Sequence, residues 1–395
     1  MSVLSRSGFA SPTLTKAADK LHVCIIQPVM KQYRLPFFTA LERSLAEHGI
    51  GLTVVYGTPW AREALRGDNV SLPAPLGFEV KSFYLLNKLL VIPVLRPWLR
   101  ADLVIVEQAN KNVLNYFLHL LRGLGLKRLA FWGHGRDMQA APEKWGERFK
   151  RLYLRSVDWW FAYTFGARDY VVGQGFDPSR TTAVENAVDT RAMREQAESV
   201  TDVEKRLALY GLGWDENACI GVYCGSLYGN KHVDRLITLS DEIHAAHPAF
   251  RLLIIGGGPE EAAFAQLAAE RPWVRMVGPK FGREKFVLLA LASVWLNPGL
   301  VGLGVLDAFC AGLPVLTRKV GPHSPELEYI TDDVNGYVMF DNSWEAYTRL
   351  VIDLLHDEPR LERLRAGARE SALHYSIETM VANFTSGVVA CLARS

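Results

Sequence analysis

Residues 292–316 read ASVWLNPGLVGLGVLDAFCAGLPVL, and this stretch decides the class of fold. A short apolar run ends at Gly299, a turn with glycines at Gly302 and Gly304 follows, and a small-residue helix then carries Asp307 near its start. Glycine allows positive φ and close approach of a ligand to the backbone. A helix N-terminus behind such a turn presents N–H groups to an anion. The stretch indicates a site for a nucleotide sugar or another phosphorylated ligand, with an ordinary strand–turn–helix corner as the alternative.

The same stretch resembles the donor-site motif of the family 4 retaining glycosyltransferases, which usually reads E-G-F-G-L-P-x-L-E-A. The second glutamate of that motif falls on Asp307 and the first falls on Gly299, which has no side chain. The resemblance implies that Asp307 holds the ribose of a nucleotide, and that the turn Gly302-Leu303-Gly304 stabilises its diphosphate. It also implies that this chain lacks the family's contact to the donor sugar at position 299.

Length and composition limit the number of domains and the class of protein. A chain of 395 residues predicts two domains of about 150–200 residues each. Hydrophobic residues make up 49% and charged residues 22%, which is typical of a globular protein. A net charge of +2 excludes a globally basic nucleic-acid binder. The 5 cysteines form no CxxC pair, so neither a zinc site nor a disulfide framework is predicted, and a reducing compartment fits.

Short apolar runs alternate with helical patterns, which is typical of parallel βαβ architecture. The predicted strands of the first half are His22–Ile26, Leu52–Tyr56, Leu103–Val106, Leu129–Trp132, Trp160–Tyr163 and Thr182–Val184. Those of the second half are Ala218–Cys224, Arg251–Ile255, Val274–Val277, Val294–Asn297, Val315–Thr317 and Gly336–Met339. The polar stretch Thr190–Glu204 is the predicted linker, and no run is long and apolar enough to predict a membrane span.

With the resemblance, these patterns imply an α/β protein of the GT-B fold, in which two Rossmann-like parallel-sheet domains face each other across a cleft. We expect a loose tail at residues 1–20, an acceptor-side domain at 21–200 and a nucleotide-sugar-binding domain at 201–376. Residues 377–395 are expected to form a helix that crosses back to the first domain.

The segment Ile220–Lys231 reads IGVYCGSLYGNK, a buried strand, a glycine turn and a lysine before a helix. An ammonium there can neutralise a diphosphate. The segment resembles the family's G-R-L-x-x-x-K-G element, so Lys231 is implied to grip the donor pyrophosphate, with Ser226 in place of the arginine. As an isolated residue, Lys231 reads as a solvated surface lysine.

The segment Leu252–Glu261 reads LLIIGGGPEE and does not fit a Rossmann dinucleotide fingerprint, because the third glycine position holds Glu261. It resembles the I-x-G-x-G-P turn of the same family, in which Gly257 and Gly258 leave room for the donor. Gly278 and Lys280 match the family loop that reads the nucleobase, and a simple tight turn is the alternative.

On the acceptor side, residues 131–137 read FWGHGRD, with glycines on both sides of His134 at a strand end. In open α/β sheets ligands bind at that edge, and the resemblance implies that His134 faces the reacting sugar. Arg136 next to it can orient a sugar or form a local ion pair. Tyr33 and Arg34 follow the first strand and are implied to contact the acceptor, with a plain surface loop as the alternative.

The segment Leu85–Arg100 is apolar and basic and carries no acid, and Arg148–Trp160 is similar. Such composition favours an anionic membrane surface, and a buried helix with scattered charges is the alternative. We therefore expect a cytoplasmic protein, peripheral on the inner face of the membrane if this surface binds lipid.

The expected reaction is retaining transfer of a sugar from a nucleotide-sugar donor to a hydroxyl of a glycan or lipid-linked acceptor. No Asp-x-Asp metal motif occurs in the chain, so no metal and no cofactor are expected. The departure at Gly299 keeps open a GT-B protein that binds nucleotide or glycan without transfer. A nucleotide-sugar epimerase is a weaker alternative.

Overall fold

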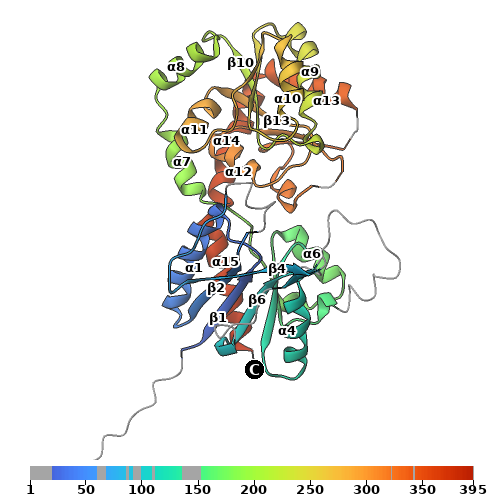
Figure 1. Cartoon of the computed structure of the whole chain (residues 1–395). Helices are drawn as coiled ribbons and strands as arrows, with labels where there is room; N and C mark the ends of the chain where they lie inside the picture. The colour runs from blue at the N-terminus through green and yellow to red at the C-terminus, as the bar shows by residue number, and fades with distance from the viewer. Residues whose placement is uncertain are drawn as a thin grey trace, which may run out of the picture.

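The computed structural model describes residues 20–59, 68–85, 89–91, 99–108, 112–135, 153–321, 323–340 and 343–394. Within these ranges the chain folds into two parallel α/β domains, drawn one above the other in Figure 1. The N-terminal domain is the lower one in that view, and the C-terminal domain is the upper one.

The N-terminal sheet has the strand order β3-β2-β1-β6-β7-β8-β9 among the described residues, and all its pairs are parallel. Its strands are β1 (His22–Gln27), β2 (Gly51–Gly57), β3 (Gly77–Val80), β6 (Leu103–Glu107), β7 (Arg128–Gly133), β8 (Trp159–Ala162) and β9 (Thr181–Ala183). Its helical elements are η1 (Gln32–Arg34), α1 (Leu35–Glu47), α4 (Val113–Gly123), α6 (Phe165–Gly173) and η2 (Pro178–Arg180). All the strands predicted for this half are present.

Two features of this domain escaped prediction. Strand β3 is a short edge strand whose two central residues are exposed, so it lacks the apolar run of a buried parallel strand. The antiparallel hairpin of β4 (Phe83–Leu85) and β5 (Leu89–Val91) overlaps the expected membrane surface at residues 85–100. Most of that surface, and residues 148–152 of the second one, lie outside the described residues.

The C-terminal sheet has the order β12-β11-β10-β13-β14-β15 and is also parallel throughout its described strands. These are β10 (Cys219–Cys224), β11 (Phe250–Ile255), β12 (Val274–Met276), β13 (Ala292–Asn297), β14 (Val315–Arg318) and β15 (Gly336–Met339). The helical elements are η3 (Gly229–Lys231), α9 (Val233–Ala246), α10 (Glu261–Ala269), α11 (Gly282–Leu289), α12 (Gly304–Cys310), η4 (Pro325–Tyr329), α13 (Trp344–Leu355) and α14 (Glu358–His374). Every strand predicted for this half is present as well.

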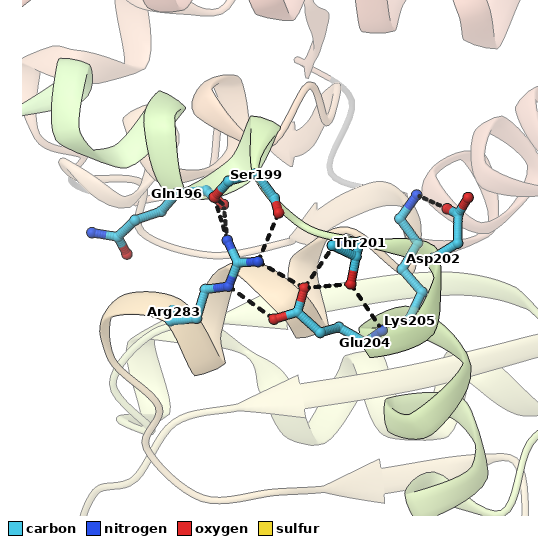
Figure 2. Close-up of polar contacts among 7 residues, drawn as sticks. All are labelled: Gln196, Ser199, Thr201, Asp202, Glu204, Lys205 and Arg283. Carbon is cyan, nitrogen blue, oxygen red and sulfur yellow. Dashed lines mark hydrogen bonds and ion pairs between the residues drawn. The ribbon is translucent and has the colours of Figure 1, made fainter.

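The predicted linker forms two helices, α7 (Thr190–Glu198) and α8 (Asp202–Leu212). Arg283 of α11 fastens both of them to the C-terminal domain (Figure 2). Its guanidinium donates to both carboxylate oxygens of Glu204, at 3.0 and 2.7 Å, and to the backbone oxygens of Gln196 and Ser199. These bonds, with those from Thr201, lower the pKa of Glu204 to about 2. The helices therefore pack with the second sheet.

The last helix, α15 (Ile377–Ala393), returns to the N-terminal domain, as the fold prediction required. Phe384 stacks on Phe161 of β8 with ring centroids 4.3 Å apart, and Thr385 is hydrogen-bonded to Ser44 of α1. A Cβ at Gly387 would lie 2.5 Å from the Thr182 hydroxyl, so this close approach requires glycine. Helix α15 thus ties the two domains together.

The helical stretch Glu358–Ala393, which contains α14 and α15, has the length and apolarity needed to cross a membrane. Half of its most apolar window is buried inside the protein. Because core helices share these properties and α15 packs on the N-terminal sheet, the stretch is weak evidence for a membrane span.

Candidate functional site

The carboxyl ends of the two sheets meet at a shared cavity of about 760 Å³. Its N-terminal wall includes His134, which follows β7, and Thr164, which follows β8. Its C-terminal wall includes Lys319 and His323, which follow β14. Parallel α/β sheets bind ligands at this edge. Of the predicted site residues that the structure describes, His134 lines this cavity, whereas Lys231 and Asp307 do not. The glycine turn after β13 reaches the lining through the hydrogen bond between Val301 and His323.

The glycine turn after β13 packs directly on the end of η3. A Cβ at Gly299 would lie 2.5 Å from both the carbonyl oxygen of Asn230 and the carbonyl carbon of Lys231. The Leu300 amide donates to the Asn230 oxygen at 3.1 Å, and the Lys231 ammonium donates to the Leu300 oxygen at 2.5 Å. The structure therefore brings Lys231 and the turn together, and it leaves no space for a side chain at position 299.

The amides at the start of α12 have no hydrogen-bond partner among the described residues. No hydrogen-bond acceptor is recorded there for the N–H groups of Gly302, Leu303 and Gly304. The neighbouring amide of Val301 donates to Nδ1 of His323 at 3.1 Å. Unpaired donors at a helix start can bind an anion, and these three lie in the same turn whose Leu300 carbonyl accepts from Lys231.

Lys231 supplies the positive charge next to these amides. Burial lowers the pKa of its ammonium to about 8, because desolvation disfavours the charged form. Within the described part of the chain no carboxylate lies within 4 Å of that ammonium. A bound diphosphate would supply the missing negative charge.

Asp307, predicted to hold ribose, is paired with Lys285 of α11 at 2.5 Å. The two side chains are 21% and 17% exposed. A carboxylate paired in this way keeps its second oxygen for a ligand, and its contact with a ribose stays a prediction. The pairing of Lys285 with Asp307 was not predicted, because no local sequence pattern indicates that α11 and α12 are in contact.

Ser226 lies in the exposed turn between β10 and η3, where its carbonyl accepts the Tyr223 hydroxyl at 2.9 Å. A Cβ at Gly258 would lie 2.6 Å from the Leu227 oxygen, and one at Gly257 would lie 3.1 Å from Glu261. The room that Gly258 leaves is therefore filled by the neighbouring turn, which is a packing reason for this glycine.

Gly278 adopts φ +71, and its carbonyl accepts the Gly256 amide at 3.0 Å. Space around its missing side chain is open, with nothing within 4 Å. Lys280 pairs with Glu284 one helical turn further on. The loop is thus a left-handed turn that favours glycine, and its contact with a nucleobase stays a prediction.

The N-terminal wall is built from side chains rather than backbone. The ring of His134 meets Tyr163 edge-on at 4.4 Å. Arg34 is only 6% exposed, and its guanidinium lies 4.8 Å from the Trp132 ring and 5.0 Å from that of Tyr33. Arg34 is therefore enclosed by aromatic rings, whereas Tyr33 is 40% exposed. Arg136 lies outside the described residues.

Two glutamates of η4, Glu326 and Glu328, form hydrogen bonds from the C-terminal domain to the N-terminal side. Neither was predicted from the sequence. Asn186 donates to Glu326 at 2.6 Å, and burial raises the pKa of that carboxyl. The Gly166 amide, at the start of α6, donates to both carboxylate oxygens of Glu328 at 3.1 Å. These contacts span more than a hundred residues of sequence, so no local pattern could indicate them.

Residues 211–371 match the family model Glycosyl transferases group 1. This part of the chain is therefore similar to the domain that the glycosyltransferases of group 1 share. The match runs from the end of α8 to α14, and it contains Lys231, the turn Gly299–Gly304 and Asp307. The predicted site residues of the C-terminal domain therefore all lie within the matched segment.

EpsD of Bacillus subtilis (strain 168), a protein assigned to the glycosyltransferases, is 25% identical over 237 residues, which cover 57% of this chain and 60% of EpsD. The GDP-mannose-dependent monoacylated alpha-(1-6)-phosphatidylinositol monomannoside mannosyltransferase of Corynebacterium glutamicum is 27% identical over 181 residues, covering 43% of this chain and 46% of that protein. The chain thus spans at most about 60% of the length of these curated relatives.

Among solved structures, Anabaena HepE in complex with UDP superposes with a TM-score of 0.68 and 12% identity, covering 93% of this chain and 100% of HepE. At that identity the likeness shows the fold alone. It confirms the predicted arrangement of two parallel-sheet domains, the GT-B fold.

Proposed function

We propose that this chain transfers a sugar from a nucleotide-sugar donor to a hydroxyl of a glycan or lipid-linked acceptor, with retention at the anomeric carbon and without a metal ion. The observation that carries the proposal is the contact between Lys231 and the turn Gly299–Gly304. A desolvated ammonium beside amides that lack an acceptor in the described structure suits the charge that develops on a departing diphosphate.

Each wall of the cleft has a separate task in this proposal. Lys231 and the amides of the Gly302–Gly304 turn hold the diphosphate, and the Asp307–Lys285 pair meets the ribose. His134, on the opposite wall, faces the reacting sugar. The acceptor hydroxyl enters from the N-terminal side and gives its proton to the leaving phosphate, so the protein supplies no nucleophile.

The relatives support the donor and acceptor classes without fixing either. HepE was crystallised with UDP and with UDP-glucose, and the Corynebacterium glutamicum relative is named for GDP-mannose and a phosphatidylinositol mannoside. We therefore place this chain among the enzymes that build polysaccharides or glycolipids, acting at the cytoplasmic face of the membrane.

The test is turnover of a panel of UDP- and GDP-sugars by wild type, Lys231→Ala and Asp307→Ala. Lys205→Ala is the matched control, since Lys205 of α8 pairs with Asp202 on the surface, at 3.2 Å, away from the cleft. We expect release of nucleoside diphosphate by wild type and the control, and a loss of it in both site variants. Turnover that survives Lys231→Ala and Asp307→Ala would refute the site.

A second candidate is a GT-B protein that binds a nucleotide without transferring a sugar. Two observations favour it: position 299 has no room for an acid, and Asp307 is already paired with Lys285. A wild-type chain that binds UDP or GDP in calorimetry, but turns over no donor in the presence of any acceptor tried, would favour this candidate.

A further inference from the structure

A second large cavity lies at the edge of the N-terminal sheet opposite the cleft. Its volume is about 710 Å³, and it is lined by residues from the starts of β6 and β7, from η2 and from the end of α15. The cleft lies at the carboxyl ends of the same strands. The two cavities are therefore separated by the length of the sheet, and the proposed transfer reaction makes no use of the second one.

The second cavity is basic. Its lining includes five cations and two carboxylates, namely Arg122, Lys127, Arg128, Arg180 and Arg394 with Asp102 and Asp158. Arg122 pairs with Asp158 at 2.9 Å. Lys127 donates to the carbonyls of Leu99 and Ala101, and Arg128 to those of Cys391 and Leu392. Arg180 and Arg394 share the carboxylate of Asp177, at 3.5 and 3.9 Å. In the described structure neither Lys127 nor Arg128 has a carboxylate within 4 Å, so five cations face three carboxylates and an excess of positive charge remains.

Three exposed leucines lie in or next to the chain segment 122–128 that lines the cavity. Leu120 near the end of α4, and Leu124 and Leu126 in the following turn, are 58%, 64% and 63% exposed. Leu126 lines the cavity, and Arg122 and Lys127 lie between and beside these leucines in the sequence. The opposite face of α4 packs inward through Leu114 and Leu118. A helix that is apolar on both faces normally has a partner on the outer one.

We propose that this basic cavity and the three leucines form a docking site for anionic phospholipids of a bilayer. The lipid phosphate occupies the cavity beside Lys127 and Arg128, and the leucines enter the boundary between headgroups and acyl chains. The charge excess selects an anionic surface over a neutral one, and the leucines distinguish a bilayer from a dissolved phosphate. This site adjoins the end of the expected surface at Leu85–Arg100, since Lys127 donates to the Leu99 carbonyl, and it does not depend on the proposed function.

The test is flotation of the full chain with vesicles of phosphatidylcholine, with and without phosphatidylglycerol. We expect binding to the anionic vesicles only, and weaker binding as salt is added, because surface charges are screened. Each cation removed from the cavity should weaken partitioning about fivefold.

Two variants address the two halves of the site. Lys127→Gln with Arg394→Gln removes charge, and Leu124→Asn with Leu126→Asn removes apolar surface from residues that carry no core packing. The matched controls are Lys205→Gln and Leu207→Asn on α8, because Leu207 is 65% exposed in the other domain. Nucleotide binding of all variants should stay at the wild-type value, and a cooperative melting transition should show that each variant is folded.

Loss of flotation in both cavity variants, with both controls unchanged, supports the docking site. Three outcomes would overturn it. These are wild-type chain that stays with the soluble fraction, stabilisation by inorganic phosphate in a thermal shift without vesicle binding, and self-association in light scattering that the leucine changes abolish. The last outcome would assign the surface to a second copy of the chain.

Discussion

The two walls of the cleft are built in opposite ways. The C-terminal domain presents backbone beside its wall: Gly299 packs on the end of η3, and the turn up to Gly304, which is bonded to His323 of the lining, offers amides together with one ammonium. The N-terminal wall presents side chains: Arg34 is enclosed by the rings of Trp132 and Tyr33, and His134 rests against Tyr163. We infer that the first wall binds the donor and that the second positions the reacting sugar and the acceptor.

Lys231→Ala should distinguish the two walls most strongly, through a large loss of nucleotide affinity. Removing a desolvated cation from a diphosphate site costs about 3 kcal/mol for a charge-assisted contact, which is roughly a hundredfold in affinity. Calorimetry with UDP and GDP measures this. Affinity that falls less than tenfold would mean that Lys231 does not contact the diphosphate.

His134→Ala should lower the transfer rate and leave the nucleoside diphosphate affinity nearly unchanged. Losing a polar contact to the reacting sugar lowers the transfer rate by about a hundredfold, whereas nucleoside diphosphate affinity stays within about twofold because the diphosphate is held by the other wall. Paired rate and binding measurements check this. A parallel loss of both would place His134 in the donor site and break the division between the walls.

The backbone character of the donor wall can be tested with two alanines. Gly299→Ala forces a Cβ to within 2.5 Å of the Asn230 oxygen and should destabilise the protein by about 2 kcal/mol. Gly302→Ala is the matched control, since the nearest atom would be Ser324 Oγ at 3.6 Å. Urea unfolding reports both. Equal stability of the two variants would contradict the contact between the turn and η3.

Nucleotide affinity should fall at alkaline pH. Burial lowers the pKa of Lys231 to about 8, so the ammonium is mostly charged at pH 7 and mostly neutral at pH 9. Because an anionic ligand favours the charged form, affinity should drop about tenfold between these values. Lys231→Ala should show a flat profile. An equally steep profile in that variant would assign the titration to another group.

The smallest effect is expected at the Asp307–Lys285 pair. Lys285→Met leaves an uncompensated carboxylate beside an anionic ligand, which should weaken binding about fivefold. Lys285→Met with Asp307→Asn should restore part of the loss, and a double-mutant cycle measures the coupling. No coupling between the two changes would show that the pair does not act as a unit at the ribose.

The sequence was most informative where backbone conformation decides the structure. The β13–α12 turn and the alternation of buried strands are local patterns, and each predicted strand was found because its apolar run is short and bounded. The contacts of Lys285, Glu326 and Glu328 could not be predicted, because their partners lie far away in the sequence. The predicted acceptor contact of Arg34 stays a prediction, and its aromatic enclosure was not predicted, since that enclosure depends on Trp132 from another strand.

The central claim is that a donor diphosphate lies against Lys231 and the amides of the Gly302–Gly304 turn. A crystal structure of the chain soaked with UDP or GDP tests it most directly. We predict that diphosphate oxygens lie within hydrogen-bond distance of the Lys231 ammonium and of at least one of these amides. A diphosphate bound elsewhere, with Lys231 still turned to the Leu300 carbonyl, would contradict the claim.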